Sequence, residues 1–255
     1  DEFLFGQVRE LCTNYGPIDC VWFDGEWDRP MADWKSEALI AEIRTLQPNA
    51  LINDRVGKDE RGRNRLVDFY TREQPVEIDK AAEFEGRTAI PWEACMTIGE
   101  SWGYKEGDAP LKSATELIRR LVDIVSRGGN LLLNVGPNAD GEIPPPLVER
   151  LEAIGAWLKA NGESIYGTTA SPFINLPAGK CTAKDNRLYI HLETHPGGPL
   201  ALPSLQNDIR RAWLLKTGEP LRFDNANKQI YLPETLPDDA VATVAIELDG
   251  PPVVK

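Results

Sequence analysis

The fold is decided by one stretch of sequence, Ile18-Asp19-Cys20-Val21-Trp22-Phe23-Asp24-Gly25. Its apolar, β-branched and aromatic residues follow one another almost without interruption, which is typical of a strand buried on both faces of a parallel sheet. An aspartate and a glycine follow where the apolar run stops. The stretch therefore predicts an α/β fold with a carboxylate at the carboxyl end of a buried strand.

The segments after this strand alternate between helical and extended patterns. Apolar residues at helical spacing predict helices over residues 3–15, 35–46, 113–125 and 147–158, and short apolar runs predict strands over 18–23, 50–52, 66–70, 88–96 and 130–135. This order implies a parallel sheet with helical crossovers. Polar residues gather near the strand ends, as at the active-site edge of a (β/α)₈ barrel. A doubly wound sheet would also place residues there, but no glycine-rich phosphate loop follows the first strand, which favours the barrel.

The pattern changes after about residue 168. Short β-rich segments over 188–192, 212–215, 229–232 and 241–248 alternate with Pro, Gly and Asn turns. This pattern is typical of a small antiparallel β-sandwich. The sequence therefore predicts a partial (β/α)₈ TIM-like barrel over residues 1–167, with about half of the strands, followed by a β-sandwich domain over residues 168–255.

The charge of the chain limits its partners. The formal net charge is -12, which argues against nucleic acid as a partner because phosphate binding needs a positive surface. Residues 1–165 hold 19 Lys+Arg against 30 Asp+Glu, whereas residues 166–255 hold 9 against 10. The acidic part suits carboxylate chemistry on a neutral substrate. No apolar stretch reaches the length of a transmembrane helix, so no membrane partner is expected.

The cysteines and histidines do not predict a metal site. The four cysteines form no CxxC pair, and the two histidines, His191 and His195, are remote in sequence from three of them. Cys20 and Cys95 lie inside apolar runs, where a free cysteine usually acts as a small buried hydrophobe. Both are therefore expected to be buried.

Seven motifs occur in order along the chain. They are VWFDGEW (21–27), INDR (52–55), DFYTRE (68–73), PWEACMT (91–97), SWGY (101–104), GGNLLLNVGP (128–137) and NGESIYG (161–167). In this order the motifs resemble α-L-fucosidases of glycoside hydrolase family 29, and the β-rich tail resembles the C-terminal domain of that family. The resemblance covers essentially the whole chain.

The resemblance implies a retaining hydrolase of terminal α-L-fucose that uses no metal or organic cofactor. It identifies Asp24 as the nucleophile, Glu73 as the general acid/base and Glu93 as the alternative acid/base. Retaining glycosidases need two such carboxyl groups, ~5 Å apart. The resemblance also implies that Arg55 lies beside the bound sugar and that one or more of three tryptophans stack on it, namely Trp22, Trp92 and Trp102.

Simpler interpretations of the same residues remain open at this point. A strand-ending Asp24-Gly25 pair is often only a turn. Arg55 could form a surface ion pair with Asp54, Asp59 or Glu60. Asn134 is either a hydrogen-bonding support or a residue of the active-site rim.

The number of strands bears on assembly. Only four or five barrel strands can be counted, whereas eight β/α units typically need ~250 residues. We therefore expect a homo-oligomer that pairs half-barrels, a complementary N-terminal half-barrel, or a natural chain longer than this one. Two other functions are open: a non-catalytic carbohydrate-binding or scaffold derivative of a fucosidase, and a retaining glycosidase with another sugar specificity.

Overall fold

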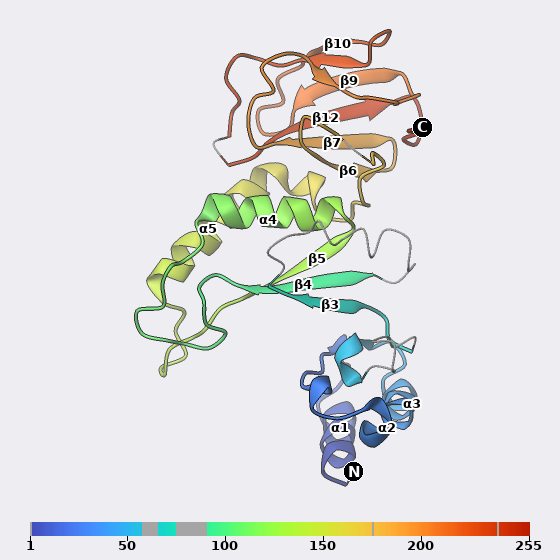
Figure 1. Ribbon diagram of the computed structural model, residues 1–255, viewed down its shortest axis with the longest axis vertical. Coiled ribbons are helices and arrows are strands. Elements are labelled where there is room, and N and C mark those ends of the chain that lie inside the picture. The colour runs from blue at the N-terminus through green and yellow to red at the C-terminus, as the bar shows by residue number, and fades with distance from the viewer. Residues whose placement is uncertain (1, 58–65, 75–90, 175, 239) are drawn as a thin grey trace. The chain divides into compact units, whose positions relative to one another are not determined.

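The computed structural model describes residues 2–57, 66–74, 91–174, 176–238 and 240–255. The chain divides into two compact units, Asp1–Glu93 and Ala94–Lys255 (Figure 1). The domain boundary predicted near residue 167 lies inside the second unit, and that division into domains stays a prediction.

The first unit contains a short parallel sheet with helices on one side. Its helices are α1 (Glu2–Asn14), α2 (Met31–Trp34) and α3 (Ser36–Leu46), its 3₁₀ turns are η1 (Glu26–Asp28) and η2 (Asp54–Val56), and its strands are β1 (Cys20–Val21), β2 (Leu51–Ile52) and β3 (Tyr70–Glu73). Strand β1 pairs with β2 in parallel, with Cys20 opposite Leu51 and Val21 opposite Ile52. A parallel bridge between Asn53 and Phe69 continues the arrangement toward β3. The predicted parallel order is confirmed for these segments.

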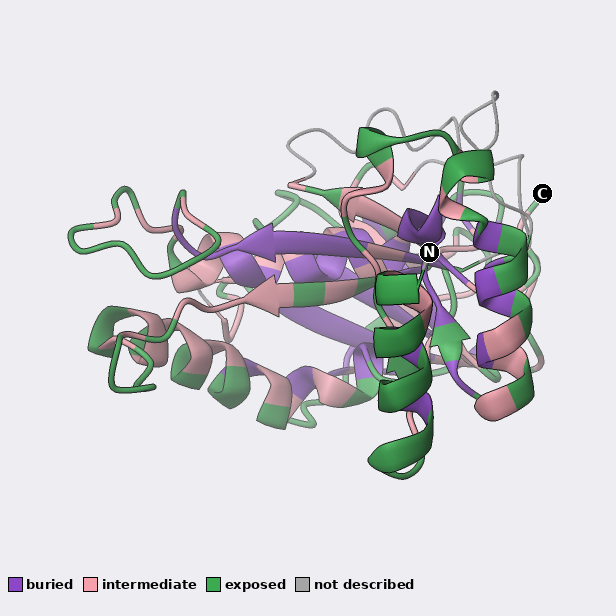
Figure 2. Cartoon of the chain, turned by 90° about the horizontal axis from the view of Figure 1, so that it is seen from below, coloured by how far each residue is buried: buried purple, intermediate pink, exposed green. Residues whose placement is uncertain are grey.

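One face of the β1–β2 pair is covered by helices. Val21 and Ile52 point toward an apolar cluster that includes Val8 of α1 together with Leu39 and Ile43 of α3. Helix α3 buries four residues, whereas α1, mostly green in Figure 2, buries only Val8 and Cys12.

The other face of the same two strands is not covered by described residues. Cys20 is exposed, and its partner Leu51 is 51% exposed. The prediction that Cys20 is buried is therefore wrong, because side chains alternate across a strand and only Val21 and Ile52 face α1 and α3. The same prediction is confirmed for Cys95, which is buried in β4 (Trp92–Thr97).

The helices of the second unit pack between strands on two sides. Strand β4 lies beside β5 (Gly129–Asn134), and α4 (Ala114–Ser126) contacts β5, α5 (Pro145–Asn161) and β6 (Figure 1). Helix α4 begins at the predicted capping box, where the Ser113 hydroxyl accepts a hydrogen bond from the Glu116 N–H at 3.1 Å.

Helix α5 also reaches the β-rich part of the second unit. The Trp157 indole of this helix is buried and donates to the Val241 carbonyl at 2.9 Å. Val241 shares an apolar cluster with Ile118 and Val122 of α4. These contacts explain why the second compact unit continues across residue 167.

The β-rich part of this unit consists of two antiparallel sheets. One has the strand order β6-β7-β12-β9 and the other β10-β11-β8. The strands are β6 (Lys180–Lys184), β7 (Arg187–Leu192), β8 (Leu200–Ala201), β9 (Ile209–Leu214), β10 (Arg222–Asp224), β11 (Gln229–Tyr231) and β12 (Ala242–Leu248). The predicted antiparallel pairing is confirmed.

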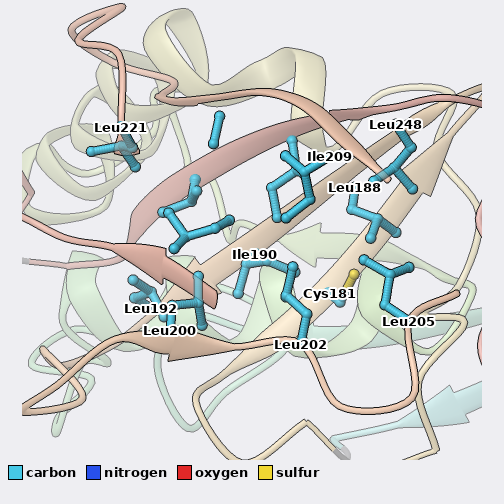
Figure 3. Close-up of a cluster of buried hydrophobic side chains, with 14 of the residues drawn as sticks. Cys181, Leu188, Ile190, Leu192, Leu200, Leu202, Leu205, Ile209, Leu221 and Leu248 are labelled. Atoms are coloured by element: carbon cyan, nitrogen blue, oxygen red, sulfur yellow. The ribbon is translucent and has the colours of Figure 1, made fainter. Parts of the chain in front are cut away.

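The two antiparallel sheets share one apolar cluster, shown in Figure 3. It combines Leu188 and Ile190 of β7 with Leu200 of β8 and Ile230 of β11. None of the sheets formed by the described residues closes into a barrel. Within the same residues, no helix combines the length and the apolar character needed to cross a membrane.

Candidate active site

The aspartate of the deciding stretch lies just beyond the end of β1. Its side chain is 55% exposed, so its carboxylate is open to a ligand. Gly25 follows with φ 92°, a left-handed conformation that favours glycine, and it begins the turn η1. A Cβ atom at Gly25 would meet nothing within 4 Å, so the space beside Asp24 is open.

The backbone before Asp24 is clamped by a buried amide. The Asn53 side chain donates to the Phe23 carbonyl at 2.9 Å and accepts from the Phe23 N–H at 2.8 Å. Asn53 is fully buried and comes directly after β2. This amide therefore ties the ends of β1 and β2 together and sets the direction in which Asp24 leaves the sheet.

Arg55 joins two of the predicted catalytic residues. Its Nη1 lies 2.7 Å from Oδ1 of Asp24, and its Nη2 lies 3.1 Å from Oε2 of Glu73. The Arg55 side chain is only 8% exposed, whereas that of Glu73 is 45% exposed. A buried cation thus holds two carboxylates that both remain accessible to solvent.

The turn η2, which carries Arg55, is itself held in place. The Ser36 hydroxyl of α3 donates to the Val56 carbonyl at 2.6 Å. On the side of β3, the Arg55 Nε–H donates to the Thr71 hydroxyl at 2.9 Å. The Thr71 N–H and hydroxyl both donate to Oδ1 of the buried Asp54, at 2.8 and 2.7 Å.

Trp22 connects Arg55 to the third candidate carboxylate. The Arg55 guanidinium carbon lies 5.0 Å from the centre of the Trp22 ring, within the range of a cation–π contact. The Trp22 indole N–H donates to Oε1 of Glu93 at 2.9 Å. Asp24, Glu73 and Glu93 therefore belong to one connected cluster around Trp22 and Arg55.

The other two predicted tryptophans lie outside this cluster of contacts. Trp92 is buried, and the guanidinium of Arg72 lies 5.9 Å from its ring centre. Trp102 belongs to the second unit, where its side chain is exposed and its carbonyl accepts from the Asn134 amide at 2.6 Å. Asn134 thus supports the segment that carries Trp102.

The surface interpretation of Arg55 is wrong, because the side chain is buried and pairs with Asp24 and Glu73. Two of the ion-pair partners considered for it, Asp59 and Glu60, lie outside the described residues. The third, Asp54, accepts hydrogen bonds from Thr71.

No metal centre accompanies this cluster in the described part of the chain. Among these residues, no group of three or more His, Cys, Asp and Glu is placed to hold a metal ion. His191 lies in the second unit, fully buried between the hydroxyls of Thr182 and Thr243. Burial lowers the pKa of His191 to about 3, so this imidazole is neutral and structural at ordinary pH.

The cluster brings two accessible carboxylates together on one arginine. Asp24 contacts Nη1 and Glu73 contacts Nη2 of the same guanidinium. The distance between the two carboxylates is therefore limited to the width of the guanidinium plus two hydrogen bonds. One ionised carboxylate can attack an anomeric carbon while a second carboxyl group transfers a proton. The supporting roles of Asn53 and Thr71 were not predicted from the sequence, although both residues lie inside the motifs that contain Arg55 and Glu73.

Comparisons with known proteins show the family of the chain. The family model described as "Alpha-L-fucosidase" matches residues 1–163. The chain therefore belongs to the alpha-L-fucosidase family, as the resemblance predicted. It is 39% identical over 174 residues to an alpha-L-fucosidase of Dictyostelium discoideum, which covers 66% of this chain and 36% of that protein. It is 36% identical over 170 residues to human plasma alpha-L-fucosidase, covering 64% of this chain and 34% of that one.

Solved structures extend the similarity beyond residue 163. Alpha-L-fucosidase isoenzyme 1 from Paenibacillus thiaminolyticus matches with a TM-score of 0.85 and 38% identity, over 97% of this chain and 62% of that chain. A GH29 alpha-L-fucosidase from Bacteroides thetaiotaomicron, solved as a trapped covalent intermediate with 2-fluoro-fucosyl fluoride, matches with a TM-score of 0.84 and 28% identity, over 98% of this chain and 61% of that chain. The chain thus spans about a third of the length of the sequence relatives and about three fifths of these structures.

The amide clamp on Phe23 leads to a stability prediction. Asn53→Ala leaves the Phe23 N–H and carbonyl without their amide partner, which should lower the free energy of unfolding by ~1–3 kcal/mol. Urea denaturation measures the change. The exposed Asn14, replaced in the same way, serves as the control and should change stability by less than about 0.5 kcal/mol. Equal effects of the two substitutions would contradict the clamp.

Proposed function

We propose that the protein is a retaining glycoside hydrolase that releases terminal α-L-fucose from fucosylated oligosaccharides or glycoconjugates. One observation carries the proposal: the Arg55 guanidinium contacts both Asp24, just beyond β1, and Glu73, the last residue of β3, and both carboxylates are accessible. Membership of the alpha-L-fucosidase family supports the choice of sugar. The reaction uses no metal or organic cofactor.

Asp24 is the nucleophile in this mechanism. Its carboxylate attacks the anomeric carbon of the fucoside, the glycosidic bond breaks, and a fucosyl-Asp24 ester forms with inverted configuration. Water then attacks the same carbon, breaks the ester and restores the original configuration. The Asn53 clamp and the Arg55 contact hold the carboxylate in one direction, which lowers the entropic cost of the attack.

Glu73 is the general acid/base. It gives a proton to the leaving oxygen in the first step and takes one from water in the second. Its contact with Arg55 places it beside Asp24. Glu93 is the alternative, supported by its hydrogen bond with Trp22, whose ring lies against the same arginine.

Arg55 and one or more of three tryptophans, Trp22, Trp92 and Trp102, bind the sugar in this proposal. Arg55 offers N–H donors to fucose hydroxyls beside the two carboxylates that it contacts. Trp22, exposed beside Arg55, is the aromatic side chain in contact with the site arginine, and the family resemblance keeps Trp92 and Trp102 as further candidates. Apolar C–H faces of a sugar suit such rings, since aromatic side chains combine large apolar area with defined geometry.

The architecture proposed with this function is a partial (β/α)₈ barrel over residues 1–167 and a β-sandwich over residues 168–255. The parallel β1–β2 pair and the apolar cluster shared by the two antiparallel sheets support it. Cys20 and Leu51, exposed on one face of β1 and β2, are side chains of the kind that a complete barrel buries inside.

The catalytic function is favoured over a non-catalytic carbohydrate-binding or scaffold role. A protein that only bound sugar would not need two accessible carboxylates on one arginine, together with a third on the adjoining tryptophan. A retaining glycosidase with another sugar specificity would use the same carboxylates, and comparing aryl α-L-fucosides with aryl galactosides separates the two.

The role of Asp24 leads to a kinetic prediction for the natural protein that contains this chain. Asp24→Gly should lower turnover of an aryl α-L-fucoside by on the order of 10⁴-fold or more, because no covalent intermediate can form. Added azide should enter the vacated space, restore cleavage of an activated fucoside and give the fucosyl azide of inverted configuration. Asp24→Asn, which fills the space, is the matched control and should not be rescued. Full activity in Asp24→Ala would refute the assignment.

The acid/base assignment is tested with two leaving groups. Glu73→Ala should lose activity on fucosides with poor leaving groups and keep much of it on activated aryl fucosides, because only a poor leaving group needs protonation. Azide should give the retained product, opposite in configuration to the product of the Asp24 variant. Glu93→Ala is the paired variant. If it shows this pattern and Glu73→Ala does not, the two roles are exchanged.

The uncovered face of β1 and β2 leads to a prediction about assembly. An apolar strand face open to water is unfavourable, so we expect a second copy or a complementary N-terminal half-barrel to cover it. Light scattering combined with intact-mass measurement on the active protein should therefore give a particle larger than this 28.3 kDa chain. A monodisperse 28.3 kDa species with full fucosidase activity would contradict the expectation.

A further inference from the structure

The hydroxyl of Thr71 bridges a buried carboxylate and the site arginine. It donates to Oδ1 of Asp54 at 2.7 Å and accepts from the Arg55 Nε–H at 2.9 Å. A threonine hydroxyl carries a single proton, so donation to Asp54 turns its lone pairs toward Arg55. A second hydrogen bond, from the Thr71 N–H to the same Asp54 oxygen at 2.8 Å, fixes the carboxylate in turn.

The backbone makes this bridge part of the site. Thr71 and Glu73 are two residues apart on β3, so their side chains lie on the same face of the strand. Asp54 and Arg55 are consecutive residues of η2. Strand β3 therefore contacts two edges of one guanidinium, with Thr71 at Nε and Glu73 at Nη2.

The two kinds of contact on Arg55 restrain different motions. The Arg55 guanidinium carbon lies 5.0 Å from the centre of the Trp22 ring, and this cation–π contact attracts the cation as a whole without fixing rotation within the guanidinium plane. A hydrogen bond at Nε opposes that rotation, because the guanidinium is a rigid planar fork. With Nε fixed, Nη1 and Nη2 keep their directions toward Asp24 and Glu73, and a sugar hydroxyl can replace a carboxylate contact without moving the plane.

We propose that Thr71 is a positioning residue which, with Asp54, sets the in-plane orientation of Arg55 against the two carboxylates. The kinetic consequence of this inference rests on the proposed fucosidase function. The orientation itself does not, and it is measured separately.

The kinetic test compares Thr71→Val with Thr71→Ser in the natural protein that contains this chain. Valine keeps the shape and the β-branching but loses the hydroxyl, whereas serine keeps the hydroxyl. Thr71→Val should lower kcat/KM on an aryl α-L-fucoside by ~10²-fold, mainly through kcat, because it misdirects the groups that react. Thr71→Ser should retain most of the activity. Equal losses in both variants, or no loss in Thr71→Val, would overturn the proposal.

The orientation is tested by nuclear magnetic resonance of the Arg55 Nε–H. Its exchange with water should be slow in the wild type and in Thr71→Ser, and faster in Thr71→Val. Fast exchange in the wild type would overturn the proposal even if Thr71→Val fails to fold. If the wild type hydrolyses no fucoside, the proposed function fails. The positioning role is still supported in that case if the Arg55 Nε–H exchanges slowly in the wild type and in Thr71→Ser but rapidly in Thr71→Val.

Discussion

The site depends on one buried cation. The Arg55 guanidinium lies at the meeting point of three segments: Asp24 after β1, its own turn η2 after β2, and Thr71 and Glu73 on β3. Removing a cation from water is costly unless anions and hydrogen-bond acceptors surround it, and Asp24, Glu73 and Thr71 supply both. The ends of the strands must therefore lie where their side chains can accept hydrogen bonds from the Arg55 guanidinium. The same contacts bring together two carboxylates that repel each other in the absence of a cation.

The polar groups around Arg55 fall into two sets, the carboxyl groups that can react and the side chains that hold them in position. Asp24, Glu73 and Glu93 are the groups able to react, and they face solvent or an indole N–H. Beneath them, Asn53 holds the backbone of Phe23, and the Asp54–Thr71 pair holds the edge of the guanidinium. Catalytic geometry needs such support, because a displacement of about 1 Å can cost on the order of 10²-fold in rate. Asn53 and Asp54 are buried and Thr71 is partly buried, so substitutions at these positions are expected to displace the groups that they hold.

Much of this could be predicted from the sequence, for physical reasons. The run from Ile18 to Asp24 and the run before Asn53 identified strands, because apolar β-branched segments that end in polar residues are specific to buried parallel strands. The clustering of Asp24, Arg55 and Glu73 followed from strand ends meeting at one edge of a sheet. The exposure of Cys20 was not predicted, since an apolar run does not reveal which of its two faces has a partner. The roles of Asn53 and Thr71 were also missed, because an amide or a hydroxyl has no charge or spacing that marks it as a support until its partners are known in space.

The proposed function requires that Asp24 form a covalent bond with the sugar. Incubation of the natural protein with 2-fluoro-fucosyl fluoride, followed by proteolysis and mass spectrometry, tests it most directly, because the fluorine slows breakdown of the ester. The account predicts one 2-fluoro-fucosyl group on the peptide that contains Asp24, and no label on that peptide in Asp24→Asn. Labelling of another carboxylate, or continued fucoside hydrolysis with no trapped ester, would contradict the account.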